Sequence, residues 1–192
     1  MQRNRLKMLV EIAIFAALAL IIDLFIPSIG HSIKFSFKML PIVILALRWG
    51  VPAGLAGGFL WGLLQIVVGE AYILSVFQVF LEYIIAFTVI GLAGIMFKPI
   101  QSELSKENYS VARTGFYASL ATIIGAFIRY VFHYIAGIVF WGEYAPEGQA
   151  ASLYSLLING PAFLTEIITC IVIIWLLAPF YKTILFNKSN LK

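Results

Sequence analysis

The feature that most constrains this chain is a series of long apolar runs, separated by short segments rich in glycine, proline and charge. The hydrocarbon core of a bilayer is about 30 Å thick, and a helix needs about 20 apolar residues to cross it. At about 30 residues for each crossing with its loop, 192 residues allow about six crossings. Composition agrees, because 62% of the residues are hydrophobic and only 11% are charged. This excludes an ordinary soluble domain, in which about a quarter of the residues are charged.

The punctuation between the runs predicts one all-α domain over residues 1–192, a polytopic membrane protein with six transmembrane helices in one compact bundle. The predicted helices cover about 8–26, 35–47, 51–68, 73–97, 114–141 and 151–178. The second apolar run is too short to cross straight, so its helix either begins near Phe35 or crosses a locally thinned bilayer. The long polar stretch 98–113 is expected to be a solvated connector.

The basic residues predict how this bundle is oriented. Of the thirteen Lys and Arg residues, ten fall on the side of the two termini, two fall on the opposite side and one, Arg129, lies within a span. Since short cytoplasmic segments carry an excess of basic residues, we expect both termini in the cytoplasm and the protein in the cell membrane, most simply of a bacterium. The net charge of +4 follows from this asymmetry. A nucleic-acid partner is therefore not expected.

Four acidic residues fall within the predicted spans, where an isolated charge costs at least about 2.5–3.5 kcal/mol. Glu11 and Asp23 lie near the ends of the first span, so we expect nearby water to solvate them. Glu82 and Glu166 have no such access to water. Arg129 lies at a depth similar to that of Glu166, and we expect the two to pair as a structural tie.

Three predicted helices place a polar side chain at the same depth from one surface. At a rise of 1.5 Å per residue, Glu82 lies about 13 Å below the outer end of its helix. His133 and Asn159 lie about 12 Å below the outer ends of theirs. A carboxylate, an imidazole and an amide thus share one layer of the outer leaflet. This coincidence predicts a solute pocket that is open to the outside.

Aromatic side chains surround the predicted layer. One helix face carries a residue at every fourth position, namely Arg129, His133, Gly137 and Trp141. Gly137 is expected to leave a notch between imidazole and indole. The other aromatic residues at this depth are Tyr72, Tyr83 and Tyr154. An ordinary interfacial belt remains an alternative for Tyr72 and Trp141. A carboxylate beside aromatic faces suits a small organic cation, through charge neutralisation and cation–π contact.

Two stripes of small residues predict close approach of helices. The first is made of Gly50, Gly54, Gly58 and Gly62, and we expect it to pack inside the protein. The second is made of Ala13 and Ala17. For this pair two interpretations stay open, internal packing and an interface with another membrane protein.

Motifs that the chain lacks narrow its mechanism. It has no G-x-x-x-x-G-K-[ST], H-E-x-x-H or G-x-S-x-G sequence, and its one cysteine, Cys170, allows no disulfide or cysteine cluster. We expect no cofactor and no metal. Three classes of function remain: a solute-binding subunit of a transporter, a small proton-coupled exporter of organic cations with Glu82 as its proton and substrate site, and an intramembrane enzyme that uses His133.

Five segments of the chain resemble a known family. They are EIAIFAALA (11–19), LALRWG (45–50), FQVFLEYI (77–84), RYVFHYIAG (129–137) with WG (141–142), and YSLLING (154–160). Together they resemble the thiamin-specific substrate-binding subunits, called S-components, of energy-coupling factor (ECF) vitamin transporters. The resemblance covers essentially the whole chain. It implies six helices, an outward-facing thiamin site, delivery of the vitamin into the cell and no enzymatic activity.

The resemblance also implies roles for the matching residues. Glu82 would hydrogen-bond the aminopyrimidine ring of thiamin, and His133 and Trp141 would lie near its thiazolium ring. The residues that would complete or border the pocket are Tyr83, Tyr154, Asn159, Gly137 and, at the periphery, Tyr72. Arg129 is kept among the candidate substrate-binding residues as the deepest member of its helix row.

The resemblance extends to partners. Ala13 and Ala17 match an Ala-xxx-Ala contact with the transmembrane coupling subunit of the energising module, which also contains two ATPases. One departure from the family lies in the loop after the first helix. Some relatives carry a Trp there against the ligand, and Ile29 to Lys38 contains none, so His31 or Phe35 would have to replace it.

Overall fold

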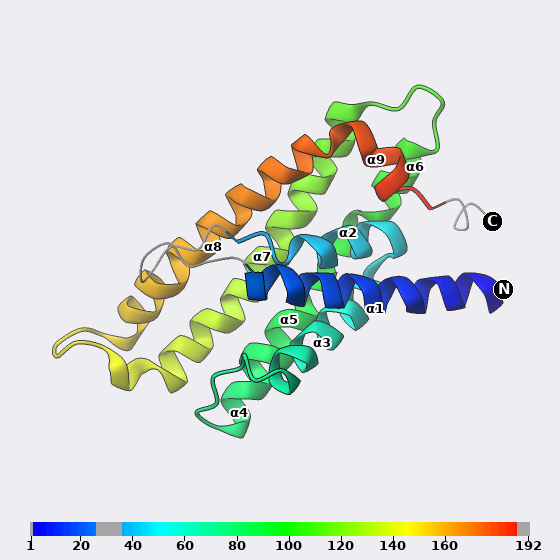
Figure 1. The fold of residues 1–192 in the computed structure, drawn as a ribbon. Helices are drawn as coiled ribbons and strands as arrows, with labels where there is room; N and C mark the ends of the chain where they lie inside the picture. Colours follow the sequence, from blue (N-terminus) through cyan, green and yellow to red (C-terminus); the bar gives the residue numbers. More distant parts are fainter. Residues whose placement is uncertain (1, 26–35, 188–192) are drawn as a thin grey trace.

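The computed structural model describes residues 2–25 and 36–187, and all regular elements in these ranges are helical (Figure 1). The longer helices are α1 (Gln2–Phe25), α2 (Leu40–Trp49), α3 (Val51–Val67), α6 (Phe97–Leu104), α7 (Val111–Phe140) and α8 (Ala151–Leu176). The short ones are α4 (Val76–Val79), η1 (Phe80–Ile85), α5 (Ala86–Thr88), η2 (Val89–Met96), η3 (Gly142–Tyr144), η4 (Ala178–Phe180) and α9 (Tyr181–Ile184). The predicted all-α class is confirmed for the described residues.

Four helical stretches are long and apolar enough to cross a membrane: α1, the continuous run Val76–Leu104, α7 and α8. The other two apolar helices are shorter. At 1.5 Å per residue, the 10 residues of α2 span about 15 Å and the 17 residues of α3 about 26 Å. The number of crossings therefore stays a prediction, whereas the multi-pass character of the chain is established by the four long helices.

The second predicted helix begins later than expected. Residues 36–39 are not helical, and α2 starts at Leu40 with Pro41 in its first turn. Proline favours this position because its missing amide hydrogen would have no partner in a first turn. Phe35, where the sequence would allow an earlier start, lies outside the described residues.

The fourth predicted helix differs from a regular α-helix and extends further than expected. Its run contains a π-helical turn, η1, and a 3-10 stretch, η2, before it continues as α6. The expectation of a solvated connector from residue 98 is thus wrong for its first part, because α6 buries Gln101 and Glu103. Lys106 Nζ at 2.6 Å and Arg113 Nη1 at 3.1 Å neutralise the Glu103 carboxylate, which makes its burial possible.

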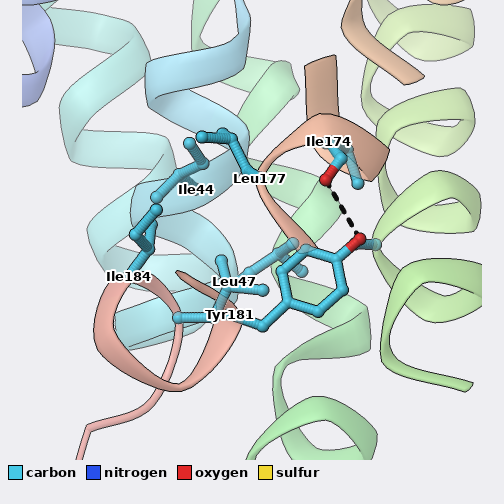
Figure 2. Close-up of a pocket in the computed structure, with 8 residues that line it drawn as sticks. Ile44, Leu47, Ile174, Leu177, Tyr181 and Ile184 are labelled. Carbon is cyan, nitrogen blue, oxygen red and sulfur yellow. Dashed lines mark hydrogen bonds between the residues drawn. The ribbon is translucent and has the colours of Figure 1, made fainter. Parts of the chain in front are cut away.

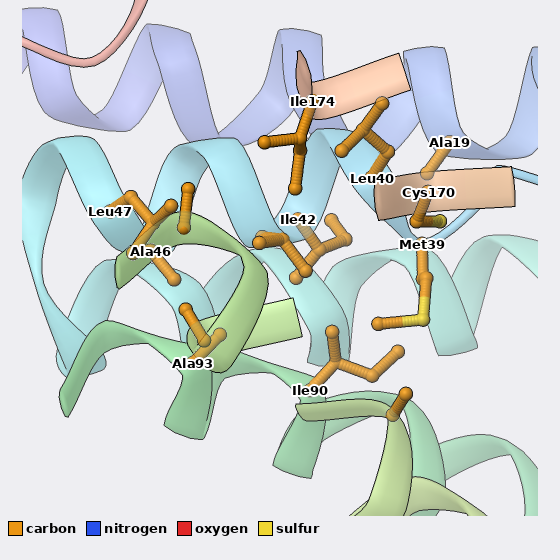
Figure 3. Close-up of a cluster of buried hydrophobic side chains, with 14 of the residues drawn as sticks. Ala19, Met39, Leu40, Ile42, Ala46, Leu47, Ile90, Ala93, Cys170 and Ile174 are labelled. Carbon is orange, nitrogen blue, oxygen red and sulfur yellow. The ribbon is translucent and has the colours of Figure 1, made fainter. Parts of the chain in front are cut away.

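The helices pack in a regular order across the bundle. Helix α7 packs against α8 on one side and against η2 on the other (Figure 1). The η2 segment packs against α2 and α3, and α1 covers these two helices. The main buried cluster joins these layers: Ala19 of α1, Ala46 of α2, Ile90 of η2 and Cys170 of α8 all belong to it (Figure 3).

The glycine stripe packs inside the protein, as predicted. A Cβ atom on Gly54 would lie 2.8 Å from the Cα atom of Gly91, so α3 and η2 touch through their backbones. Gly50 has a different role, because it joins α2 to α3 with a φ of +88°. L-residues rarely adopt this conformation, and glycine adopts it without strain.

Candidate functional site

The centre of the predicted site is the carboxylate of Glu82, which lies in the π-helical turn η1. The side chain is only 9% exposed. Its Oε1 atom accepts a hydrogen bond of 2.9 Å from Trp141 Nε1, at the end of α7. Its Oε2 atom accepts a hydrogen bond from Gln78 Nε2. Both donors are neutral, so they orient the carboxylate without cancelling its charge.

Gln78 is a site residue that the sequence analysis missed. It is fully buried and lies one helical turn before Glu82, on the same helix face. Its amide also donates to the carbonyl of Tyr72 at 3.1 Å and accepts from the amide of Leu74 at 3.1 Å. Gln78 thus fixes the loop before α4 onto the carboxylate. The four-residue spacing from Glu82 was the signal that could have identified it.

Aromatic rings form one side of the site. The ring centroids of Tyr72 and Trp141 are 5.1 Å apart, and those of Trp141 and Tyr144 are 5.6 Å apart. The hydroxyl of Tyr83 accepts a hydrogen bond of 2.9 Å from the Tyr72 amide. The structure therefore brings Glu82, Tyr72, Tyr83 and Trp141 together. A simple interfacial belt does not account for the indole that donates to a buried carboxylate.

Arg129 and Glu166 form the predicted tie between α7 and α8. Arg129 Nη1 lies 2.6 Å from Glu166 Oε2, and both side chains are mostly buried. The guanidinium carbon lies 4.9 Å from the ring centroid of Phe87 and 5.6 Å from that of Trp61. The positive charge of Arg129 is therefore balanced by a carboxylate and by two aromatic faces.

The remaining predicted residues lie on α7 and α8. His133 meets the ring of Phe87 at a centroid distance of 6.3 Å, and its Nε2 atom is buried without a hydrogen-bond partner among the described residues. Asn159 Nδ2 donates to the carbonyl and the hydroxyl of Ser155 at 3.1 and 3.2 Å. Tyr154, in the first turn of α8, is half-buried.

The notch predicted at Gly137 is not empty. A Cβ atom there would lie 2.8 Å from the Cβ atom of Ser155 and 3.1 Å from Asn159 Nδ2. The space is used for close packing of α7 against α8, and the Ser155 hydroxyl donates to the carbonyl of Tyr134 at 2.8 Å. Gly137 therefore lets Ser155 and Asn159 of α8 approach α7 closely. The sequence had instead predicted an open notch at this glycine.

The expectation that water solvates Glu11 and Asp23 is wrong. Glu11 Oε2 accepts hydrogen bonds from Arg48 Nε at 2.7 Å and from Trp49 Nε1 at 2.6 Å. Asp23 accepts from Lys38 Nζ at 2.8 Å and from Gln65 Nε2 at 2.6 Å. Proximity to the end of a helix in the sequence did not reveal that α2, α3 and the segment before α2 supply these partners.

The two alanines of α1 point away from the bundle core. Ala13 is exposed and Ala17 is half-buried, whereas Ala16 and Ala19 are fully buried. The Ala13 face also exposes Leu9, Val10 and Ile14. Expectations about the loop after α1, including His31, mostly concern residues outside the described ranges.

The charges of the described residues divide the buried carboxylates into two kinds. Glu11, Asp23, Glu103 and Glu166 each lie within 4.0 Å of a Lys or Arg nitrogen. Glu82 has no such partner among residues 2–25 and 36–187 and is held by an amide and an indole. In the same part of the chain, no three His, Cys, Asp or Glu side chains are grouped as metal ligands would be. A carboxylate beside aromatic rings can accept an organic cation, by charge neutralisation and cation–π contact.

Fold and site together define a multi-pass helical membrane protein with a negatively charged, aromatic-walled site. Its sequence matches the model of the family described as "Thiamine transporter protein" (Thia_YuaJ) over residues 9–186. The chain belongs to this family.

Relatives of known name and structure agree. The chain is 37% identical over 180 residues to the thiamine transporter ThiT of Lacticaseibacillus paracasei, a match that covers 92% of this chain and 89% of that protein. It is 36% identical over 181 residues to ThiT of Bacillus subtilis, with 92% of each chain covered. The solved structure of ThiT from Listeria monocytogenes is similar with a TM-score of 0.88 and 36% identity, covering 96% of this chain and all of that one.

Membership of this family decides between the classes that the sequence left open. The family consists of transporters, so the predicted absence of enzymatic activity is supported and an intramembrane enzyme that uses His133 is not. The alternative of a proton-coupled exporter also finds no support among these relatives. The expectation of a multi-pass membrane protein is confirmed.

Proposed function

We propose that this protein binds thiamin from outside the cell and delivers it inward as the substrate-binding subunit of an ATP-driven ECF transporter. The observation that carries this proposal is the environment of Glu82. Its buried carboxylate is oriented by two neutral donors, Gln78 and Trp141, and the ring of Trp141 lies against that of Tyr72. Thiamin offers the complementary chemistry, since it combines an aminopyrimidine with a positively charged thiazolium ring.

In this proposal each side of the site holds one part of the ligand. Glu82 accepts hydrogen bonds from the aminopyrimidine and supplies negative charge, and Trp141 stacks on the thiazolium ring. The unpartnered Nε2 atom of His133 is available to the ligand. Residues that border the pocket are Tyr72, Tyr83, Tyr154 and Asn159. Two residues act indirectly. Gly137 lets Asn159 of α8 lie close to α7, and Arg129 holds α7 and α8 together below the pocket through its ion pair with Glu166.

Transport requires a source of energy, and the chain has no nucleotide-binding motif. We infer that the exposed face of α1 around Ala13 and Ala17 docks against the coupling subunit of the energising module. Small side chains on an exposed helix face let a second helix approach closely. The accompanying topology is a single domain with six crossings and both termini in the cytoplasm, as the basic residues predict. This places the Glu82 site in the outer leaflet.

Equilibrium titration of the purified protein with thiamin tests the binding function. Thiamin should bind tightly, its separate pyrimidine and thiazole halves should bind far more weakly, and an analogue with an uncharged ring in place of the thiazolium should lose most of its affinity. Equal affinity for thiamin and for the uncharged analogue would contradict the role of Glu82 as the charge partner.

A further inference from the structure

The segment after α8 returns to the bundle and docks at one end, which we call the α9 end; it comprises Glu11, Arg48, Gln101 and residues 181–187. Tyr181 is 2% exposed, and its hydroxyl donates to the carbonyl of Ile174 at 3.0 Å (Figure 2). Figure 2 shows this ring and Ile184 facing Ile44 and Leu47 of α2. The apolar side of the returning segment is therefore seated on α2.

Backbone hydrogen bonds to buried side chains hold the same segment. Gln101 of α6 donates to the carbonyls of Leu47 at 2.9 Å and Leu185 at 2.8 Å, and it accepts from the amide of Asn187 at 3.0 Å. Gln101 thus ties residues 185–187 to the end of α2. None of these three hydrogen bonds involves α1.

Arg48 makes the connection that Gln101 lacks. Its Nη1 atom donates to the carbonyls of Thr183, Ile184 and Phe186 at 3.2, 2.9 and 3.0 Å. The other edge of the guanidinium binds α1, with Nε 2.7 Å from Glu11 Oε2 and Nη2 3.4 Å from Glu11 Oε1. A planar guanidinium holds its donors in a fixed fork. The position of Glu11 on α1 is therefore fixed relative to the carbonyls of residues 183–186.

The first half of helix α1 packs on the bundle through Ile12 and the partly buried Met8. The residues that α1 buries along its whole length are Ile12, Ala16, Ala19 and Leu20. Of these, Ile12 packs in a small separate cluster with Leu45 and Ala53. Glu11 precedes Ile12 and faces the bundle, whereas Ala13 follows it and faces away. A rotation of α1 about its own axis would therefore break the Glu11 contacts and move the Ala13 face together.

We propose that Glu11 and Arg48 form a positioning joint, which sets the rotation of α1 by the docking of residues 181–187. Trp49 completes the joint by donating to Glu11 Oε2 at 2.6 Å. The joint presents the Ala13 and Ala17 face at a fixed angle to a partner. This part rests on the proposed function, because it takes that face as the docking surface. The mechanical link between α1 and residues 181–187 does not depend on it.

Hydrogen exchange of the full-length protein in nanodiscs, with thiamin bound, tests the mechanical link. Glu11→Gln and Arg48→Lys should each accelerate exchange about tenfold in the first half of α1 and in residues 181–187 at once. Gln101→Ala should accelerate exchange in residues 181–187 alone. The matched control is Lys7→Gln, which removes an exposed group 3.8 Å from the same carboxylate and should change neither segment. Unchanged exchange in α1 of both joint variants would overturn the proposal.

Uptake into vesicles that contain the complete transporter tests the consequence for the partner. Glu11→Gln should lower uptake at least about fivefold while thiamin affinity stays close to that of the unchanged protein. Uptake at the unchanged level would overturn the positioning role. A variant in which both Ala13 and Ala17 are replaced by Trp separates a failure of the joint from a failure of the proposed docking surface. If that variant also transports normally, the docking surface is wrong, and exchange alone still decides whether the joint exists.

Discussion

Two acidic side chains in different regions of this molecule, Glu11 and Glu82, are held in opposite ways. At the α9 end, Glu11 is bound by Arg48, and nearby Glu103 is bound by Lys106 and Arg113. Around Glu82, the donors are the neutral side chains of Gln78 and Trp141. Pairing makes a buried charge a permanent part of the fold, whereas neutral donors leave a charge that a ligand can still neutralise.

This difference separates structural from functional acidic residues better than depth does. Glu166 was predicted to lie deep within its span, like Glu82. Unlike Glu82, it forms an ion pair, because Arg129 Nη1 lies 2.6 Å from Glu166 Oε2. Glu82 has no cationic partner among the described residues, and an acidic group of this kind within a membrane span is by default a candidate for function. The comparison makes predictions for both regions.

The largest effect is expected at the Ala13 and Ala17 face of α1, which lies outside the Glu82 site. Replacing Ala13 and Ala17 together by Trp should abolish ATP-driven uptake, because the bulky rings hold the coupling helices apart. Thiamin affinity of the isolated subunit should change little, since the Glu82 site is built on η1, α7 and α8. Uptake into vesicles measures the expected loss of transport, and titration in detergent measures the expected retention of thiamin binding. Loss of binding together with uptake would mean that these alanines pack inside the subunit.

Glu82→Gln tests the acidic side chain with neutral donors. Losing one charge-assisted contact should cost about 1.5–3 kcal/mol of binding free energy, or about 10-fold to 150-fold in the dissociation constant for thiamin. Glu11→Gln provides the matched change of a carboxylate to an amide in the other region and should leave affinity nearly unchanged. Titration of both purified variants measures this. Equal affinities of the unchanged and Glu82 proteins would remove Glu82 from the site.

Effects on stability should rank differently from effects on binding: Glu166→Gln should lower the unfolding free energy more than Glu82→Gln does. Glu166→Gln leaves the mostly buried Arg129 without its carboxylate, and breaking such a pair typically costs about 3–5 kcal/mol of unfolding free energy. Glu82→Gln removes a charge that has no cationic partner among the described residues but leaves one acceptor oxygen for two donors, so ligand-free protein should lose less, about 1–3 kcal/mol. Thermal unfolding without thiamin compares the two. A Glu82 variant that melts as early as the Glu166 variant would show that both carboxylates are structural.

The smallest effect is spectroscopic. Stacking of a heteroaromatic cation on Trp141 should quench tryptophan emission, while Trp49, Trp61 and Trp175 contribute little to the change. Trp141→Phe should therefore abolish most of the signal on addition of thiamin, and Trp175→Phe is the control. A fluorescence change that survives intact in the Trp141 variant would show that this indole does not stack on the ligand.

The apolar runs were enough to predict the helical class. The pairing of Arg129 with Glu166 and the inward packing of the glycine stripe were also predicted correctly. These features depend on periodicity and depth, which a single sequence contains. The hydrogen bond between Glu82 and Trp141, 59 positions apart, did not follow from the depth argument, which grouped Glu82 with His133 and Asn159 and placed Trp141 at the outer end of its helix.

Other features could not be read from the sequence because they depend on contacts between distant segments. The partners of Glu11 and Asp23 lie 37 and 15 residues away, and spacing along one helix cannot identify them. The filled notch at Gly137 required the position of Ser155 on a neighbouring helix. The π-helical turn has no distinct hydrophobic period over six residues, so the pattern predicted a regular helix there.

That turn makes the site sensitive to chain length as well as to side-chain identity. A π-turn holds one residue more than the α-helical turn it replaces, so it amounts to a one-residue insertion that the helix has absorbed. Deleting a single residue between Phe80 and Ile85 would restore regular winding and keep the helix continuous. Everything on one side of the deletion would then turn by about 100° relative to the other side. If the deleted residue lies between Glu82 and Ile85, Gln78 and Glu82 stay four residues apart and turn together, so the carboxylate leaves Trp141 at the end of α7 although no remaining residue has been substituted.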